Sequence, residues 1–207
     1  MHISEGVLSA PVLITGAGLT AVGLAISLKK MDNEDIPGIA VITAGLFVAS
    51  LIHIPLGPSS VHLLLNGIAG IILSWHVFPA FLVALFLQAV LFQFGGITVL
   101  GVNTLILALP AILGFYLFKL LNHKNELRFK IASFSCTALA VLLTALLAAF
   151  VLMFTEEAFL HLARMIILTH IPLIVLEGIV GLFCLSFIRR IKPEMIEGEI
   201  IYDQEND

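Results

Sequence analysis

The first two residues of the chain offer an unusual set of nitrogen atoms. In Met1-His2, the terminal amine, the amide nitrogen of His2 and its imidazole can close a five-membered and a six-membered chelate ring around one metal ion. The three donors then lie nearly in one plane, and a fourth nitrogen from elsewhere would complete a square. Planar nitrogen coordination suits Ni2+ or Cu2+ better than Zn2+, which prefers a tetrahedron. The alternative is that Met1-His2 is a frayed terminus.

A second histidine is a candidate for the fourth nitrogen. The segment 53–62 contains two prolines, a glycine and two serines, a composition that ends one helix and begins the next. We therefore expect His62 in the first turn of a helix, with Asn66 four residues later on the same face. The alternative is an interfacial or capping histidine.

Other polar groups could support these ligands. A histidine that binds a metal usually donates its other ring nitrogen to a partner, and Asn66, Asn103, His170 and Glu5 are candidates. Glu177 lies deep in an apolar run, where a carboxylate is costly, two helical turns after His170. It is either a proton carrier that drives transport or a structural acid bonded to a neighbouring helix.

Composition shows which solvent surrounds these groups. The chain has 207 residues, of which 60% are apolar and 12% are charged, and its mean hydropathy is +1.13. A soluble domain of this size could not bury so much apolar surface, which excludes an ordinary soluble enzyme and a disordered protein. With 10 basic and 14 acidic residues, no basic surface is available for nucleic acid. Cys136 and Cys184 lie in apolar runs and are expected to be small buried hydrophobes.

The apolar runs predict an all-α, polytopic membrane protein with about seven transmembrane helices. Their expected ranges are 7–28, 36–54, 61–74, 77–94, 99–121, 131–154 and 162–188. Together they form a metal-capture domain over residues 1–193, followed by an acidic cytoplasmic tail over residues 194–207. Ala17, Ala21 and Ala25 form a row that permits close approach of a helix from this chain or from a partner subunit.

The basic residues predict the orientation. If the N-terminus is outside, nine of the ten basic residues fall in cytoplasmic segments and only Arg164 falls outside. The positive-inside rule then places the C-terminus in the cytoplasm and favours an odd number of spans. No basic residue precedes the first apolar run, so we expect that run to be a retained span rather than a cleaved signal.

Four motifs resemble the CbiM/NikM family, the substrate-capture membrane subunits of cobalt and nickel energy-coupling-factor transporters. Residues 1–6 (MHISEG) resemble the opening of that family, and residues 57–63 (GPSSVHL) resemble its second motif. Residues 88–103 resemble the third motif, and His170 with Glu177-Gly178 resembles the fourth. Many members carry Met where this chain has Ser4, and some carry Gly-Thr-Ser in the second motif; neither difference removes a proposed nitrogen donor.

The resemblance implies a site and a set of partners. It implies that the Met1 amine, the His2 amide and imidazole, and the His62 imidazole bind the transported Co2+ or Ni2+, without a prosthetic group. It also implies a transmembrane coupling subunit, ABC-type ATPase subunits and a small accessory membrane subunit in the cell membrane. The sequence has no Gly-x-x-x-x-Gly-Lys-Ser/Thr phosphate loop, so we expect a transport subunit rather than an enzyme. Planar nitrogen coordination favours nickel, whereas the wider sequence resembles cobalt transporters of corrinoid pathways.

Two rival functions belong to other classes. A proton-coupled secondary metal transporter would use His170 and Glu177 and would need no ATPase. The resemblance favours the structural role of Glu177 over this proton relay. A membrane metalloenzyme or haem protein is the weaker rival, because the sequence has no His-Glu-x-x-His motif and no paired mid-span histidines.

Overall fold

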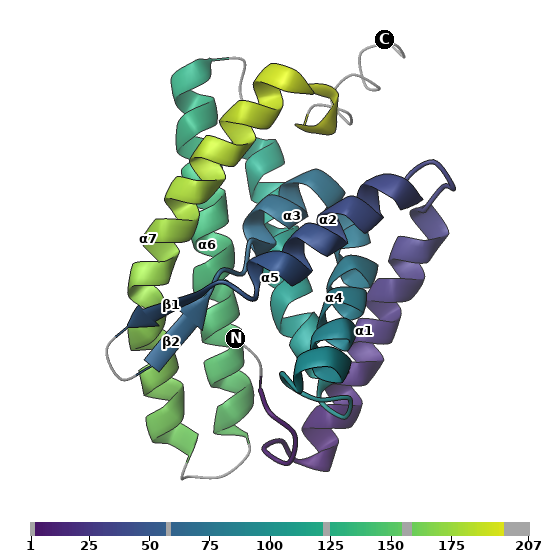
Figure 1. The fold of residues 1–207 in the computed structure, drawn as a ribbon, viewed down its shortest axis with the longest axis vertical. Helices are drawn as coiled ribbons and strands as arrows, with labels where there is room; N and C mark the ends of the chain where they lie inside the picture. Colours follow the sequence, from purple (N-terminus) through teal and green to yellow (C-terminus); the bar gives the residue numbers. More distant parts are fainter. Residues whose placement is uncertain (1–2, 57–58, 122–124, 155–158, 197–207) are drawn as a thin grey trace.

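The computed structural model describes residues 3–56, 59–121, 125–154 and 159–196. Within these ranges the chain forms seven α-helices, one antiparallel hairpin and one 3-10 turn (Figure 1). In chain order the elements are α1 (Ala10–Lys30), α2 (Ile36–Ala49), β1 (His53–Leu56), β2 (Ser59–His62), α3 (Asn66–Leu73), η1 (Ser74–His76), α4 (Val77–Phe92), α5 (Leu100–Leu121), α6 (Glu126–Met153) and α7 (Phe159–Ile191). The helical fold class predicted from the sequence is confirmed.

Most of the helices are long and apolar enough to cross a membrane. The five such stretches in the described residues are Ala10–Lys30, Asn66–Phe92, Leu100–Leu121, Glu126–Met153 and His170–Ile191. Large apolar side chains point outward from them and from α2: Ile14 is 73% exposed, Val41 70% and Leu120 80%. Such a surface suits hydrocarbon rather than water. The chain is therefore a multi-pass membrane protein.

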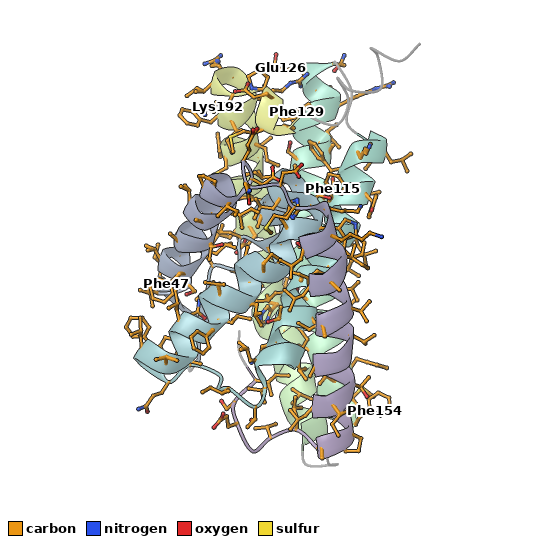
Figure 2. The ribbon with its side chains drawn as sticks, turned by 90° about the vertical axis from the view of Figure 1, so that its right-hand side faces the viewer. Phe47, Phe115, Glu126, Phe129, Phe154 and Lys192 are labelled. Carbon is orange, nitrogen blue, oxygen red and sulfur yellow. The ribbon has the colours of Figure 1, made fainter. Side chains whose placement is uncertain are left out.

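The basic residues of the chain lie mainly at one end of the helix bundle. α1, α5 and α7 finish, and α6 begins, in the upper part of Figure 1. Figure 2 likewise shows Glu126 and Lys192 at one end and Phe154 at the other. The end with Glu126 and Lys192 also carries most of the basic residues: Lys29, Lys30, Lys119, Arg128, Lys130, Arg189, Arg190 and Lys192. The positive-inside rule predicts that this end faces the cytoplasm.

The two expected spans 36–54 and 61–74 form shorter helices than the sequence predicts. α2 ends at Ala49, and α3 has eight residues, a length of roughly 12 Å that cannot cross a bilayer. Between them β1 pairs with β2, with His53 opposite His62. The hairpin lies beside the middle of α7 and not at an end of the bundle (Figure 1). The pairing satisfies the backbone groups that the two strands turn toward each other.

The position of His62 is a second correction. The sequence predicts His62 and Asn66 on one face of a single helix, but His62 ends β2 and Asn66 begins α3. Leu65 stands between them with a φ of 50°, in the left-handed region, so the chain changes direction there. The two side chains therefore do not share a helix face.

α1 packs through a row of small residues, and it is not the alanine row. Gly16 and Gly23 are buried on α1, and a Cβ at either would lie within 2.5 Å of Val102 or Phe78. Thr20, between them, donates to the Gly101 carbonyl at 2.6 Å. Ala17, Ala21 and Ala25 are exposed. Ala17 still borders α5, because a Cβ at Gly101 would lie 2.7 Å from its Cα, so the alanine row lies at the edge of the α1–α5 contact with its outer side exposed.

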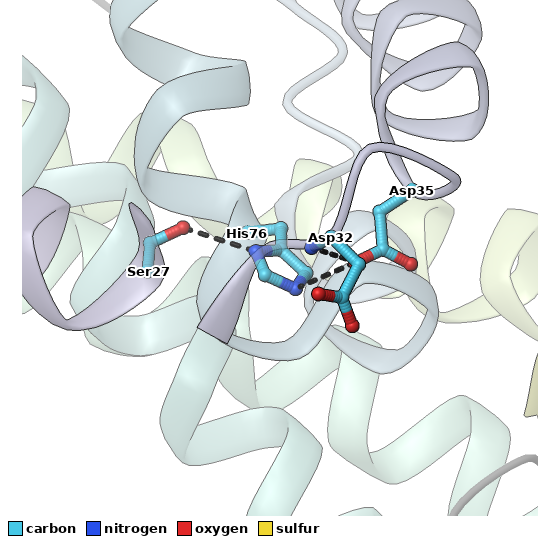
Figure 3. A network of polar contacts seen from close by, with 4 residues as sticks. All are labelled: Ser27, Asp32, Asp35 and His76. Carbon is cyan, nitrogen blue, oxygen red and sulfur yellow. Dashed lines mark hydrogen bonds and ion pairs between the residues drawn. The ribbon is translucent and has the colours of Figure 1, made fainter. Parts of the chain in front are cut away.

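A polar network joins helices at the basic end of the bundle. The η1 residue His76 lies with Nδ1 3.1 Å from Ser27 Oγ and Nε2 3.9 Å from Asp35 Oδ2, while Asp35 also accepts from the Asp32 N–H at 2.9 Å (Figure 3). His76 therefore joins the end of α1 to the start of α2. The sequence places His123 on the same side, but residue 123 lies outside the described residues.

Candidate metal-capture site

The segment that follows the predicted chelate is held inside the bundle. Met1 and His2 lie outside the described residues, which begin at Ile3. Ile3 is buried, and Asn103 near the start of α5 holds its backbone from both sides. The Ile3 N–H donates to Asn103 Oδ1 at 3.0 Å, and Asn103 Nδ2 donates to the Ile3 carbonyl at 3.0 Å. The Asn103 side-chain amide thus satisfies both backbone groups of Ile3, as a neighbouring β-strand would.

The loop between α4 and α5 holds the same segment a little further along. The Glu5 N–H donates to the Gly95 carbonyl at 3.2 Å, and Glu5 Oε1 accepts from the Thr98 N–H at 3.1 Å. Gly96 has a φ of 146°, and a Cβ there would lie 1.9 Å from the Glu5 Cγ. Only glycine fits at this contact, so Glu5 positions the N-terminal segment through this loop.

His62 presents one ring nitrogen in a defined protonation state. Its side chain is buried, and Nδ1 lies 3.0 Å from the Leu63 carbonyl. A carbonyl only accepts, so Nδ1 carries the proton and Nε2 carries the lone pair. Burial lowers the pKa of His62, which keeps the imidazole neutral at neutral pH. A neutral imidazole with a fixed tautomer is the form that binds a metal ion.

Glu177 shapes the backbone next to His62. From the middle of α7 its carboxylate accepts from the N–H groups of Leu64 and Leu65, the latter at 3.1 Å and 3.0 Å to its two oxygens. These donors precede α3, and the carboxylate satisfies them in place of a local cap. Glu177 is 1% exposed. It therefore fixes the turn that separates His62 from α3.

Asn66 and His170 are both buried, on different elements. Asn66 Nδ2 donates to Thr144 Oγ1 at 2.8 Å, and Thr144 donates to the Ile106 carbonyl at 3.2 Å. Asn66 therefore ties α3 to α6, and Thr144 ties α6 to α5. His170 is 4% exposed on α7, two turns before Glu177. The roles expected for these two residues around the ligands stay predictions.

Two polar residues beside His62 were not among the predicted site residues. Ser50 and Gln88 line a cavity of about 10 Å3 together with His62 and Leu107. Gln88 Nε2 donates to Ser50 Oγ at 2.6 Å, and Gln88 is 2% exposed. Gln88 stands at the start of the third family-like motif, but a lone glutamine in an apolar run gives no sign of its partner.

α5 relates the N-terminal segment to His62. Asn103, which holds Ile3, and Leu107, which lines the His62 cavity, are one turn apart on this helix, a separation of about 5–6 Å between their Cβ atoms. Among the described residues no group of three or more His, Cys, Asp or Glu could hold a metal ion. Any site at His62 must therefore draw its other donors from different atoms or from residues 1–2.

Comparison with known proteins identifies the family. Residues 2–195 match the family described as CbiM, cobalt uptake substrate-specific transmembrane region. The chain belongs to the CbiM family. A metal transport protein of Haemophilus influenzae is 40% identical over 199 residues, which cover 95% of this chain and 97% of the relative. The family resemblance predicted from the sequence motifs is confirmed.

Two further relatives of this CbiM-family chain bear on assembly and fold. A fused cobalt transport protein, CbiMQ, of Methanocorpusculum labreanum is 28% identical over 215 residues, covering 94% of this chain and 36% of the fusion. A crystal structure of a transition metal transporter has a TM-score of 0.74 with 24% identity and covers 99% of both chains. The second likeness shows that the fold is shared.

Proposed function

We propose that this CbiM-family chain captures Co2+ or Ni2+ from the outer side of the cell membrane for an ATP-driven energy-coupling-factor transporter. Four nitrogens hold the ion: the Met1 amine, the His2 amide, the His2 imidazole and Nε2 of His62. Asn103 and Glu5 hold the N-terminal segment, and Glu177 holds the backbone beside His62. The ion is the cargo of the protein and not a resident cofactor.

The observation that carries this proposal is the double hydrogen bond between Asn103 and the backbone of Ile3. It fixes the residue that follows His2 inside the bundle, one helical turn of α5 from the wall of the His62 cavity. Two residues of extended chain span at most about 7 Å. The chelate atoms of Met1 and His2 are therefore within reach of this region of the bundle.

Energy for release comes from partner subunits. The relative CbiMQ joins a region matched by this chain to further sequence in one polypeptide, which supports association with a transmembrane coupling subunit. ABC-type ATPase subunits supply ATP hydrolysis, and a small accessory membrane subunit completes the assembly. The exposed alanine row at Ala17, Ala21 and Ala25 suits close packing against a partner helix.

The contacts of Glu177 argue against the alternative of a proton-coupled secondary transporter. Its two oxygens accept from the backbone N–H groups before α3, a role that needs a fixed acceptor. A proton carrier would have to give up these bonds in each cycle and leave buried donors unsatisfied, at a cost of about 1–3 kcal/mol each.

Replacement of His2 by leucine tests the ligand set. His2→Leu keeps the terminal amine and removes the imidazole with its six-membered ring, so Co2+ and Ni2+ affinity measured by isothermal titration should fall at least as far as in His62→Ala. The matched control is His123→Leu, at a histidine outside the proposed site, which should bind like the parent protein. Undiminished binding in His2→Leu would overturn the proposed site.

A second variant tests whether the hydrogen bonds between Asn103 and Ile3 support metal binding. Asn103→Leu removes both bonds to the Ile3 backbone while keeping a side chain of similar volume. Loss of a residue that orients a metal ligand typically costs about 10–100-fold in affinity, and we expect this loss here. Hydrogen exchange at the Ile3 amide should speed up in the same variant. Unchanged affinity with faster exchange would show that the N-terminal segment does not carry the ligands.

A further inference from the structure

The small cavity beside His62 has a second polar wall. Gln88, on α4, lines the cavity together with His62 and Ser50. Its side-chain oxygen Oε1 is buried and has no hydrogen-bond partner among the described residues. A buried amide oxygen without a partner costs about 1–3 kcal/mol, so its presence in a packed bundle calls for a role.

The orientation of the Gln88 amide is fixed by its neighbours. The Ser50 hydroxyl donates its single proton to the Phe47 carbonyl at 2.6 Å. Ser50 Oγ can therefore only accept from Gln88, at 2.6 Å, which assigns the amide nitrogen to Ser50. Exchange of the nitrogen and oxygen positions would set two acceptors against each other. The oxygen is thus the atom of Gln88 that remains for another contact.

His62 and Gln88 both line this cavity, and each has a buried atom with a lone pair. The Leu63 carbonyl holds the proton of His62 on Nδ1, which leaves the lone pair on Nε2, and Gln88 offers a neutral carbonyl oxygen. The remaining lining consists largely of apolar side chains such as Leu85 and Phe81. A cavity of about 10 Å3 is the size of a single water molecule or a single metal ion. Two acceptors on such a cavity suit either the two O–H groups of a water molecule or a single cation, and the metal titrations below distinguish the two.

We propose that Gln88 supplies an axial oxygen donor to the ion held by His62 and thereby sets the preference between Co2+ and Ni2+. The inference rests on the proposed function, because it takes the four nitrogens as the plane of the complex. Low-spin Ni2+ in such a plane has a filled orbital along the axis, which repels an axial oxygen. Co2+ has one electron fewer and accepts a fifth donor. The oxygen of Gln88 therefore strengthens Co2+ binding with little effect on Ni2+.

Gln88→Leu and Gln88→Glu test this assignment. Leu removes the oxygen, and the Co2+ affinity should fall about tenfold or more while the Ni2+ affinity changes little. The visible absorption and electron paramagnetic resonance of bound Co2+ should shift to those of a four-coordinate complex. Glu keeps an oxygen at this position and makes it a charged, stronger donor, so it should shift the Co2+ spectrum and raise the Co2+ to Ni2+ affinity ratio. Ser133→Ala is the matched control and should bind both ions normally. It removes another buried oxygen that has no hydrogen-bond partner in the described part of the chain, near the start of α6.

The outcomes separate this inference from the proposed function. If the parent protein binds neither ion, or binds them without His62 and a free Met1 amine, the proposed function fails. If the parent binds as proposed but Gln88→Leu weakens both ions equally or neither, only the role of Gln88 is overturned. If Gln88→Leu does not fold, Gln88→Glu decides: an unchanged Co2+ spectrum and unchanged Co2+ to Ni2+ affinity ratio would contradict an axial oxygen at this position.

Discussion

The proposed ligands differ in how their protons are removed before they bind a metal ion. The Met1 amine is protonated below a pKa of about 7.7–8.0, and the His2 amide loses its proton only when the metal takes its place. His62 is different, because burial lowers its pKa below the ordinary value of 6.5. Its imidazole is therefore ready to bind across the neutral range, and the N-terminal nitrogens determine how binding depends on pH.

Metal affinity should weaken as the pH falls from 8 to 6. Below the pKa of the amine, each bound ion releases one proton from the amine and one from the amide. Affinity should then fall about 100-fold per pH unit, whereas above that pKa only the amide proton counts and the dependence is about tenfold. Isothermal titration in non-coordinating buffers at three pH values measures this slope.

An N-terminally acetylated protein is the control for this pH dependence, because it has no ionisable amine. Its residual binding should be weak and should lack the change of slope near the pKa of the amine. Equal affinity of the unmodified protein at pH 6 and pH 8 would contradict ligation by the amine and the amide. A loss of binding confined to the range below pH 6 would instead point to His62 as the ligand that titrates.

Between elements, one contact from α7 to the start of α3 sets the shape of the site. Glu177 accepts from two backbone N–H groups at the point where Leu65 takes a left-handed conformation. No side chain near Leu65 in sequence caps α3. The Glu177 carboxylate therefore accepts from the backbone N–H groups before α3, as a Ser, Thr, Asp or Asn close in sequence does at the start of most helices.

Replacement of Glu177 should separate its structural role from proton transfer. Glu177→Leu leaves two buried donors unsatisfied and should lower the free energy of unfolding by about 1–3 kcal/mol per donor, with a matching loss of metal affinity. Glu177→Gln keeps one acceptor oxygen of the same shape and should fold and bind nearly normally. Thermal unfolding in detergent and isothermal titration check both variants.

Transport assays on the same pair decide between the two functions. With its coupling and ATPase partners present, Glu177→Gln should still take up metal if the carboxylate is structural. Full loss of uptake in a Gln variant that binds metal normally would favour the proton-coupled alternative. Ser133→Ala, which is remote from the hairpin, serves as the control for expression in these cells.

The sequence predicts the helices well and the segment 53–66 poorly, for a physical reason. Apolar length and charge are local properties, so the helix number and the basic end of the bundle follow from them. The turn at Leu65 depends on Glu177, 112 residues away, and no local signal contains that contact. The prolines of 53–62 correctly predict that no helix continues through this segment, but they are equally compatible with a loop and with a hairpin.

At the scale of the whole molecule, the groups proposed to capture the ion and the basic residues lie at different levels of the bundle. The contacts that hold Ile3 and Glu5 lie toward the end opposite the basic residues. The polar network of His76, drawn in Figure 3, includes Ser27 close to Lys29 and Lys30 at the end of α1, and so lies at the basic end. The hairpin with His62 lies between them, halfway along α7 (Figure 1). α3 leads from the hairpin to η1, so a short helix directly connects the proposed ion site to the basic end.

This arrangement requires the basic end to face the cytoplasm, which cysteine labelling can measure. Ile97, in the loop before α5, is 63% exposed at the end that holds Glu5, and Lys192 is exposed just beyond α7. In intact cells a membrane-impermeant maleimide should label Ile97→Cys and spare Lys192→Cys, which should react only after permeabilisation. The parent protein is the background control, because Cys136 is buried and Cys184 is half-buried within α7. Labelling of Lys192→Cys in intact cells would reverse the orientation and place the N-terminal nitrogens on the wrong side for uptake.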